Sequence, residues 1–471
     1  MQQILTYIFI ALYSVTILSV ILVVITENRN PLKTLPWIIV LIFAPVVGLV
    51  FYFFFGQNLS KQRIISRRTR KRITMHLVEA DNPDRPGIPD RWAPLARLLR
   101  KTIHAVPLYG SRITPYIDGE SKMEALLDEI ARARHHIHLQ YYILCNDTTG
   151  GRLRDALIER ARHGVRIRIL YDDVGCSGVK KSFFESMRRE GIEIHAFLHV
   201  RFPRFTSKIN YRNHRKIAVI DGRVGFIGGM NIADRYVHGT GWGIWRDTHF
   251  RVEGNGVAGL QASFLSDWSA TTKQRINGQE YFPAARHYTP DVMQIVPSGP
   301  FGKWRTLLQG DSYAIANARR RIWIQTPYYL PSDVLNSALQ SAALAGIDVR
   351  LMLPARSDSR VVDLASHSFL DDMMKAGAKI LFYTPGFLHS KLLIIDDDLT
   401  VIGSANMDFR SFEHNFEVNA FVYDAEFTAR MAAIFDDDAT HSHLLTPAEW
   451  FNRPRPRRWA ESLMRVFSPL L

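Results

Sequence analysis

One pattern of residues occurs twice in the sequence, as NHRKIAVIDGRVGFIGGMN at residues 213–231 and as LHSKLLIIDDDLTVIGSANMD at residues 388–408. In each copy a His-x-Lys pair precedes an apolar run that ends in Asp. Gly-(Gly/Ser)-x-Asn begins seven residues after that Asp. The two histidines are 175 positions apart, since 389 − 214 = 175. A long pattern that recurs in the same order indicates an internal duplication.

The duplication extends beyond this pattern. IHLQYY from residue 137 matches IWIQTPYY from residue 322, GVRIRIL from 164 matches GIDVRLML from 346, and EGIEIHAF from 190 matches AGAKILFY from 376. Helical stretches of about 10–15 residues separate these strand patterns, as in βαβ units. We therefore predict an α/β fold of two duplicated lobes, each a mostly parallel sheet flanked by helices.

The repeated pattern has chemical content of its own. Side chains alternate along a strand, so each His-x-Lys pair projects an imidazole and an ammonium from one face, as an anion site requires. Each Asp follows the apolar run, before a turn, and we expect it to anchor the structure. The glycines allow close backbone approach, and each Asn adds donors for phosphate oxygens. Neither histidine has further ligands at zinc spacing, so we predict no metal.

Residues 4–26 and 35–55 carry no charge, and each is long enough to cross a hydrocarbon core of about 30 Å as a helix. A cleaved signal peptide is the alternative for the first stretch. However, no basic residue precedes it and no small-x-small cleavage site follows it. We predict a two-helix transmembrane hairpin over residues 1–60, with a kink at Pro45.

Seven basic residues and no acidic one lie between Lys61 and Arg72. The positive-inside rule places this cluster, and all that follows it, in the cytoplasm. The cluster is also expected to bind anionic headgroups, at about 1 kcal/mol per basic residue, unless it is a topology signal alone. Cys145 and Cys176 are too few for a disulfide framework and fit a reducing compartment.

The formal net charge of the 471 residues is +14, which at first suggests a nucleic-acid-binding protein. Residues 1–60 contribute +1, residues 61–72 contribute +7 and residues 453–471 contribute +4, which leaves +2 for residues 73–452. The excess therefore lies at the two ends and points to anionic lipid. A membrane-tethered nuclease would instead need a basic groove and salt-dependent DNA binding.

The duplicated His-x-Lys-x4-Asp motif resembles that of the phospholipase D superfamily, and the resemblance covers nearly the whole chain. RNPLKTLPW at residues 29–37 and GSANMDFRSFEHNFEVN at residues 403–419 are similar to the bacterial cardiolipin synthases in particular. The resemblance implies two phospholipase D-like lobes with one active site at their interface. One position departs from the wider pattern, because Gly229 stands where the superfamily has Ser, while Ser404 is retained.

The resemblance implies a cardiolipin synthase in a bacterial inner membrane, with two transmembrane helices and cytoplasmic lobes. Such an enzyme transfers a phosphatidyl group from one phosphatidylglycerol to another through a phosphohistidine, and releases glycerol. It needs no cofactor, and its partners are phosphatidylglycerol and the anionic bilayer, with no nucleic acid. The alternatives are a hydrolase of the phospholipase D type, a transferase with another alcohol acceptor, and less favourably a nuclease or a non-enzymatic scaffold.

By the same resemblance His214 is the nucleophile and His389 the general acid and base, although the reverse assignment stays open. Glu417 matches the acid that orients a histidine. Asp247 in WRDTHF is its expected counterpart, unless it is a surface acid at a strand end. The implied catalytic residues are His214, Lys216, Asp221, His389, Lys391 and Asp396, with Asn231, Asn406 and Ser404 on the substrate phosphate.

These features divide the chain into five segments. Residues 1–60 form the hairpin, 61–110 a basic juxtamembrane linker, 111–290 the first lobe, 291–450 the second lobe and 451–471 a basic and apolar tail. Two segments have open interpretations. The loop RFPRFTSKINYR at residues 201–212 is either interfacial or solvated, and the tail from residue 453 is either a short interfacial helix or a frayed terminus.

Overall fold

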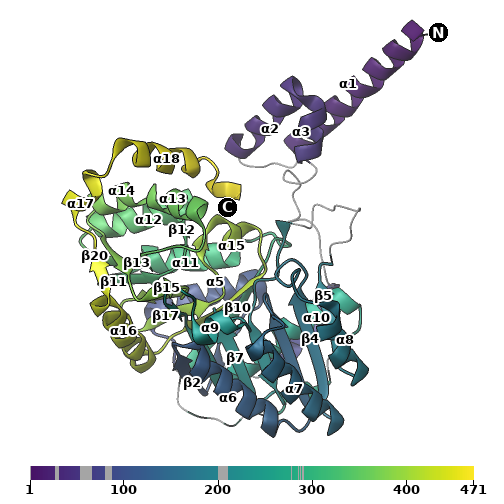
Figure 1. Cartoon of the computed structure of the whole chain (residues 1–471), viewed down its shortest axis with the longest axis vertical. Coiled ribbons are helices and arrows are strands. Elements are labelled where there is room, and N and C mark those ends of the chain that lie inside the picture. The colour runs from purple at the N-terminus through teal and green to yellow at the C-terminus, as the bar shows by residue number, and fades with distance from the viewer. Residues whose placement is uncertain are drawn as a thin grey trace. The chain divides into compact units, whose positions relative to one another are not determined.

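The computed structural model describes residues 2–26, 31–52, 66–79, 87–199, 210–276, 278–284, 286, 288 and 291–470 (Figure 1). The chain forms two compact units. The smaller comprises Met1–Gln62 with Val200–Tyr211, and the larger comprises Arg63–His199 with Arg212–Leu471. Most of the loop at residues 201–212, and the first residues of the basic cluster, lie outside the described residues.

The described part of the smaller unit contains three helices, α1 (Gln2–Thr26), α2 (Pro31–Phe43) and α3 (Pro45–Phe51). The helix breaks at Pro45, where the kink was predicted, because proline lacks an N–H and crowds the preceding turn. A Cβ at Gly48 would lie 3.1 Å from the carbonyl oxygen of Val40, so α3 turns back onto α2. Val24 of α1 packs with Leu41 and Tyr52 in a small apolar core.

Among the described residues, Gln2–Leu22 is the one helical stretch long and apolar enough to cross a membrane. The second apolar helical stretch, Thr34–Phe43, has ten residues and rises about 15 Å, half of a hydrocarbon core. The predicted two-helix hairpin is therefore not confirmed, since the second span is interrupted at Pro45.

The first lobe is built on a seven-stranded sheet in the order β2-β9-β7-β6-β3-β4-β5. Helices α6 (Gly119–Arg132), α7 (Thr148–Arg162) and α8 (Lys181–Arg189) cover one face, and α10 (Gly256–Thr272) covers the other. The strands are β2 (Ser111–Tyr116), β3 (His136–Tyr141), β4 (Arg166–Asp172), β5 (Glu193–Phe197), β6 (Ile217–Ile220), β7 (Val224–Gly228) and β9 (His249–Gly254).

The second lobe repeats this plan on a nine-stranded sheet in the order β1-β10-β19-β17-β16-β11-β13-β14-β20. One face packs on α5, α11, α12, α13 and α14, and the other on α16. These strands are β1 (Leu108–Tyr109), β10 (Val292–Ser298), β11 (Arg321–Gln325), β13 (Asp348–Pro354), β14 (Lys379–Tyr383), β16 (Leu392–Ile395), β17 (Leu399–Gly403), β19 (Glu417–Val422) and β20 (Ser442–Leu444). The helices are α5 (Ala93–Ile103), α11 (Thr306–Ala316), α12 (Asp333–Leu344), α13 (Arg360–His367), α14 (Leu370–Lys375) and α16 (Ala425–Thr440).

Both sheets are mixed, so the predicted mostly parallel sheet is wrong. Within the described strands of these two sheets, parallel pairing is confined to β3-β4-β5 and to β11-β13-β14, where helices connect the strands. The motif strands β6 and β16 instead enter antiparallel and turn directly into β7 and β17. Asp221 and Asp396 open these turns with φ of 54° and 51°, a conformation that Asp tolerates better than most residues.

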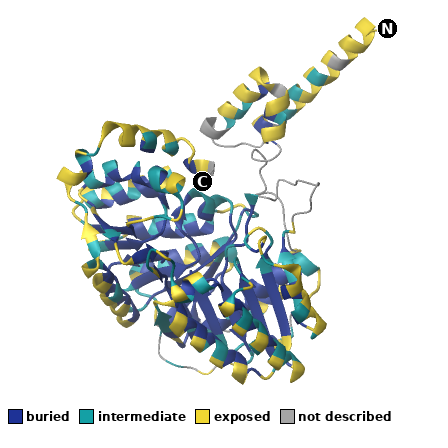
Figure 2. Ribbon diagram, in the orientation of Figure 1, coloured by how far each residue is buried: buried dark blue, intermediate teal, exposed yellow. Residues whose placement is uncertain are grey.

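One apolar core joins the lobes. Residues of α10 and of α16 belong to the same cluster, and the rings of Phe250 and Phe427 lie 5.1 Å apart. Figure 2 shows the strands buried and the outer helix faces exposed. The chain also crosses between lobes before β2, because α5 packs in the second core and β1 pairs with β10. Part of the segment expected to be a linker, residues 61–110, is thus built into the second lobe.

Candidate active site

Each motif histidine is held by backbone of the opposite lobe. The His214 N–H donates to the Phe416 carbonyl at 2.9 Å, and the His389 N–H donates to the Arg246 carbonyl at 2.7 Å. The short strand β8 (Ile244–Arg246) of the first lobe pairs in parallel with β15 (Gly386–Leu388) of the second. The two histidines therefore sit where the lobes meet, directly before or beside their motif strands.

The carboxylates beside the histidines are exchanged between lobes. His214 Nδ1 lies 3.0 Å from Glu417 Oε1, and His389 Nδ1 lies 2.5 Å from Asp247 Oδ2. Glu417 belongs to the second lobe and Asp247 to the first, and both side chains are fully buried. A carboxylate on Nδ1 fixes the tautomer and leaves Nε2 for chemistry. Each motif histidine therefore takes its carboxylate from the other lobe.

The motif lysines are buried beside the histidines. Lys216 Nζ donates to the His214 carbonyl at 2.6 Å, Lys391 Nζ donates to the His389 carbonyl, and Lys391 Nζ also lies 2.9 Å from His389 Nδ1. Burial lowers the pKa of Lys216 to about 7 and that of Lys391 to about 8, although Glu417 and Asp247 oppose the shift. The two ammonium groups form a site that an anion would stabilise.

The same burial sets the charge of the histidines and acids. Burial lowers the pKa of His214, and burial together with Lys391 lowers the pKa of His389 to about 3. Burial by itself would raise the pKa of Asp247, but Lys391 and His389 hold it below its usual value. His214 and Lys216 do the same for the pKa of Glu417. The resting site therefore pairs neutral imidazoles with ionised carboxylates, which suits nucleophilic attack by nitrogen.

Asp247 and Glu417 occupy equivalent positions, because Gly228 pairs with His249 as Gly403 pairs with Asn419. Their neighbours differ. Ser404 Oγ donates to Glu417 Oε2 at 2.5 Å, whereas a Cβ at Gly229 would collide with Asp247 Oδ1. The shorter Asp side chain thus occupies the space that a serine would need. The Ser404 hydroxyl, predicted on the substrate phosphate, is bonded to Glu417.

The predicted phosphate-binding asparagines lie on the loops after β7 and β17. Asn231 Oδ1 accepts from the Ile143 N–H at 3.0 Å, and its Nδ2 donates to Tyr236 Oη at 2.5 Å. Asn406 Nδ2 donates to Asp408 Oδ2 at 3.0 Å, and its Oδ1 is buried without a partner among the described residues.

The motif aspartates lie at the far ends of their strands from the lysines. Asp221 accepts from the N–H groups of Arg134, His135 and His136 at 2.8–2.9 Å. Asp396 accepts in the same way from residues 319–321 and also from Arg91. Each aspartate anchors the start of β3 or β11, in the manner expected from its place before the turn.

Comparison with known proteins now places this geometry in a family. The model of the cardiolipin synthase, PLD-like domain matches residues 126–241 and 313–439, one match in each lobe. The chain belongs to this family. A second model, phospholipase D-nuclease N-terminal, matches residues 11–57.

Relatives that match over most of their own length are named cardiolipin synthases. Cardiolipin synthase 2 of Bacillus anthracis is 41% identical over 95% of this chain and 89% of its own length. The major cardiolipin synthase of Bacillus subtilis is 37% identical over 98% of both chains. The crystal structure of phosphatidylserine synthase from Haemophilus influenzae Rd KW20 superposes with a TM-score of 0.60, over 80% of this chain and 98% of that one, at 13% identity. That likeness shows a shared fold.

Two buried arginines support the exchanged acids in this cardiolipin synthase family member, and sequence reasoning missed both. Arg215 donates to the Glu417 carbonyl at 3.0 Å and to Asp267 at 2.5 Å. Arg246 donates to the Asp247 carbonyl at 3.0 Å and pairs with Asp438. Their positions carried a signal, since Arg215 lies inside the first motif and Arg246 directly precedes Asp247. Gln140 and Gln325, repeated in IHLQ and IWIQ, donate to the same two aspartates.

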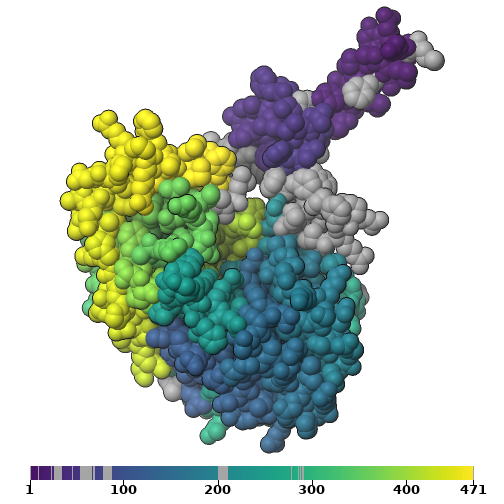
Figure 3. Space-filling view, viewed as in Figure 1, coloured from purple at the N-terminus to yellow at the C-terminus, as the bar shows by residue number. Residues whose placement is uncertain are grey.

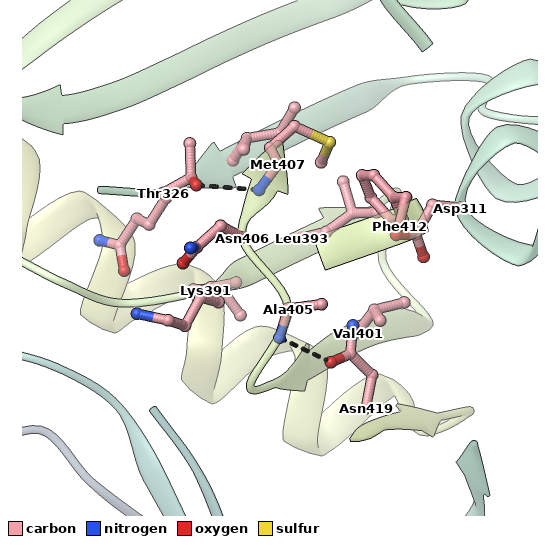
Figure 4. A pocket seen from close by; sticks show the side chains of 13 residues that line it. Asp311, Thr326, Lys391, Leu393, Val401, Ala405, Asn406, Met407, Phe412 and Asn419 are labelled. Carbon is pink, nitrogen blue, oxygen red and sulfur yellow. Dashed lines mark hydrogen bonds between the residues drawn. The ribbon is translucent and has the colours of Figure 1, made fainter. Parts of the chain in front are cut away.

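A small cavity with a mixed polar and apolar lining lies beside the second motif (Figure 4). Lys391 and Asn406 line it with Thr326 and Asn419, and Asp311 lies on its far side. Burial raises the pKa of Asp311 to about 8. Among the described residues, no three His, Cys, Asp or Glu side chains are grouped as metal ligands.

Aromatic rings surround the histidines. Tyr142 lies 4.9 Å from the His214 ring, while Trp245, Phe387 and Tyr236 lie 5.5, 5.7 and 5.9 Å from the His389 ring. We refer to Trp245, Phe387 and Tyr236, with Trp242 beside Phe387, as the aromatic rim. It gives the His389 side of the site an apolar wall.

Proposed function

We propose that the protein joins two phosphatidylglycerol molecules into cardiolipin and glycerol. The observation that carries the proposal is the pair of histidines with exchanged, buried carboxylates and two lysines beside them. One imidazole can act as nucleophile while the other moves the proton, as a two-step transfer requires. The family and its relatives support the substrate.

In the first step, His214 Nε2 attacks phosphorus of the donor and the bond from phosphorus to the glycerol oxygen breaks. His389 gives a proton to that oxygen, so glycerol leaves and a phosphohistidine remains. In the second step, His389 takes the proton of the terminal hydroxyl of a second phosphatidylglycerol. Its oxygen attacks phosphorus and releases His214, so one phosphodiester is exchanged for another.

The negative charge at phosphorus would be stabilised by Lys216, Lys391, Asn231 and Asn406, whose donors would bind the non-bridging oxygens. The bound anion has a second effect. Its negative charge opposes the positive charge of Lys391 that helps to lower the pKa of His389, so the histidine can carry a proton when substrate is present. The aromatic rim would reduce the access of water to the phosphohistidine.

Membrane attachment fits both ends of the chain. We propose α1 as a membrane anchor, with the lobes on the cytoplasmic side beside the basic residues 61–72. The tail forms α18 (Arg455–Arg465), which packs on α13, where buried Glu461 lies 3.9 Å from His367. Glu461 also pairs with Arg453 and Arg457 of the tail. Its other face exposes 74% of Trp459 and 58% of Leu463. The tail lies on the surface in yellow in Figure 3, and an apolar stripe with arginines suits an anionic bilayer.

Lipid analysis tests this function. Purified full-length protein in phosphatidylglycerol vesicles should yield cardiolipin and an equal amount of free glycerol. His214→Ala and His389→Ala variants should yield neither. Phosphatidic acid as the main product would identify a hydrolase instead, and serine or ethanolamine adducts formed in preference to cardiolipin would identify another acceptor.

A further inference from the structure

Two arginines outside the catalytic set stand on the aromatic rim. Arg235 lies on the short helix α9 (Asp234–His238), and Arg356 follows β13. The guanidinium carbon of Arg235 lies 5.2 Å from the centroid of Trp245, and that of Arg356 lies 4.5 Å from the centroid of Trp242. Both arginines are exposed, and within the described part of the chain neither pairs with a carboxylate.

Contacts through the rim connect these arginines to the histidine. Arg235 is 5.2 Å from the Trp245 ring, which is 5.5 Å from the His389 ring, so its guanidinium lies at most 5.2 + 5.5 = 10.7 Å from His389. Arg235 also lies 5.6 Å from the Tyr236 ring, whose hydroxyl accepts from Asn231. The Trp242 ring reaches His389 through Phe387, at 6.3 and 5.7 Å.

The proposed reaction requires a second anion site. The acceptor phosphatidylglycerol carries its own phosphodiester, while the motif lysines are occupied by the donor. Five bonds separate its attacking oxygen from its own phosphorus, a reach of about 6 Å. With a guanidinium–phosphate contact added, a cation for the acceptor belongs about 10 Å from the reacting centre. That is the range within which Arg235 lies.

Three other arginines near the histidines already pair with carboxylates. Arg215 pairs with Asp267, Arg246 with Asp438, and Arg212 with Asp172. The rim arginines, exposed and without a carboxylate partner among the described residues, are available to an incoming anion. Stacking on an indole holds the planar guanidinium in place while its N–H groups stay available for phosphate oxygens. The buried Trp245 Nε1 also has no acceptor among the described residues.

We propose that Arg235 and Arg356 form a second anion site that binds the phosphodiester of the acceptor phosphatidylglycerol. The proposal rests on the proposed function and adds to it the residues that select the acceptor. It implies that a lipid acceptor with a phosphate is preferred over a neutral alcohol at the same donor site.

The test compares two transfers from the same donor in the same phosphatidylglycerol vesicles. One is cardiolipin formation, and the other is exchange of labelled glycerol into phosphatidylglycerol, whose acceptor has no phosphate. Arg235→Gln and Arg356→Gln should each lower cardiolipin formation by about threefold to tenfold and together by more, with glycerol exchange within about twofold of wild type. Lysine at either position should retain part of the rate.

Arg154→Gln is the control, because Arg154 of α7 lies 5.9 Å from the ring of Phe183 of α8 and pairs with Asp155, outside the aromatic rim. It should leave both transfers unchanged. Equal loss of both transfers in the rim variants would overturn the proposal, since the arginines would then serve the donor or the fold. Unchanged cardiolipin formation in the double variant would also overturn it. A wild-type protein that catalyses neither transfer would instead refute the proposed function.

Discussion

The two halves of the active site use the same histidine and lysine but different acids. His214 is held by Glu417, which also binds the Ser404 hydroxyl. His389 is held by the shorter Asp247, which occupies the space beside Gly229. The motif strands and turns around them are otherwise alike. A duplicated fold has thus acquired its asymmetry in one pair of positions in each half, next to the imidazoles to which the proposed mechanism gives different roles.

The exchange of acids between lobes adds a second lesson. Glu417 contacts the first-lobe histidine and Asp247 contacts the second-lobe histidine. A structural change in either lobe therefore alters the surroundings of the histidine in the other lobe. The shared core and the β8–β15 pairing hold the lobes in the required register. Each half of the active site therefore consists of a histidine from one lobe and a carboxylate from the other.

The largest expected effect separates the two histidines. Replacement of either by alanine should lower cardiolipin formation by about 10⁴-fold or more. In the His389→Ala variant, or in His389→Gln if alanine destabilises the fold, a phosphatidyl group should accumulate on His214 and be detectable by mass spectrometry under mild alkaline conditions. Label found on His389 in the His214→Ala variant would reverse the assigned roles.

The next prediction concerns Gly229 and Ser404, the residues beside the two acids. Gly229→Ser should displace Asp247 and misorient His389, which we expect to lower kcat by about 10²- to 10³-fold. Adding Asp247→Glu would recreate the second-half arrangement and should recover at least about tenfold. Ser404→Ala, which only removes a hydroxyl from Glu417, is the control and should lower kcat by about tenfold. Equal rates for the single and double variants would show that the two positions are not coupled.

Much of this architecture was predictable from sequence, and the failures have local causes. The spacing of His214, Lys216 and Asp221 predicted the anchoring turn, and the repeated strands predicted two lobes. The parallel sheet was wrong because the motif strands β6 and β16 pair antiparallel with β3 and β11 and turn directly into β7 and β17. The exchange of acids was invisible, since the distance from His389 to Glu417 along the chain does not tell which lobe's histidine receives the carboxylate.

A smaller effect should appear as pH rises. The lowered lysine pKa values mean that Lys216 has lost half of its charge near pH 7 and Lys391 near pH 8. Ammonium forms prevail below those values, so a rise in pH removes positive charge and weakens phosphate binding. We expect KM for phosphatidylglycerol to rise several-fold from pH 6.5 to 8.5 while kcat changes less. Initial rates in vesicles of constant composition measure this, and a flat KM would contradict it.

The smallest expected effect concerns α18, which packs on α13 of the second lobe, outside the active site. Trp459→Ser with Leu463→Ser removes the exposed apolar stripe and leaves the Glu461 cluster and Met464 in place. Because the proposed anchor α1 is unchanged, cardiolipin formation should fall only about twofold to threefold, with Tm unchanged. Leu344→Ser, at the exposed end of α12, is the matched control. If the tail contacts the bilayer, the loss of activity should vanish in detergent micelles, because access to substrate there no longer depends on a flat anionic surface. An equal loss in micelles would instead assign the apolar stripe to the fold of the second lobe.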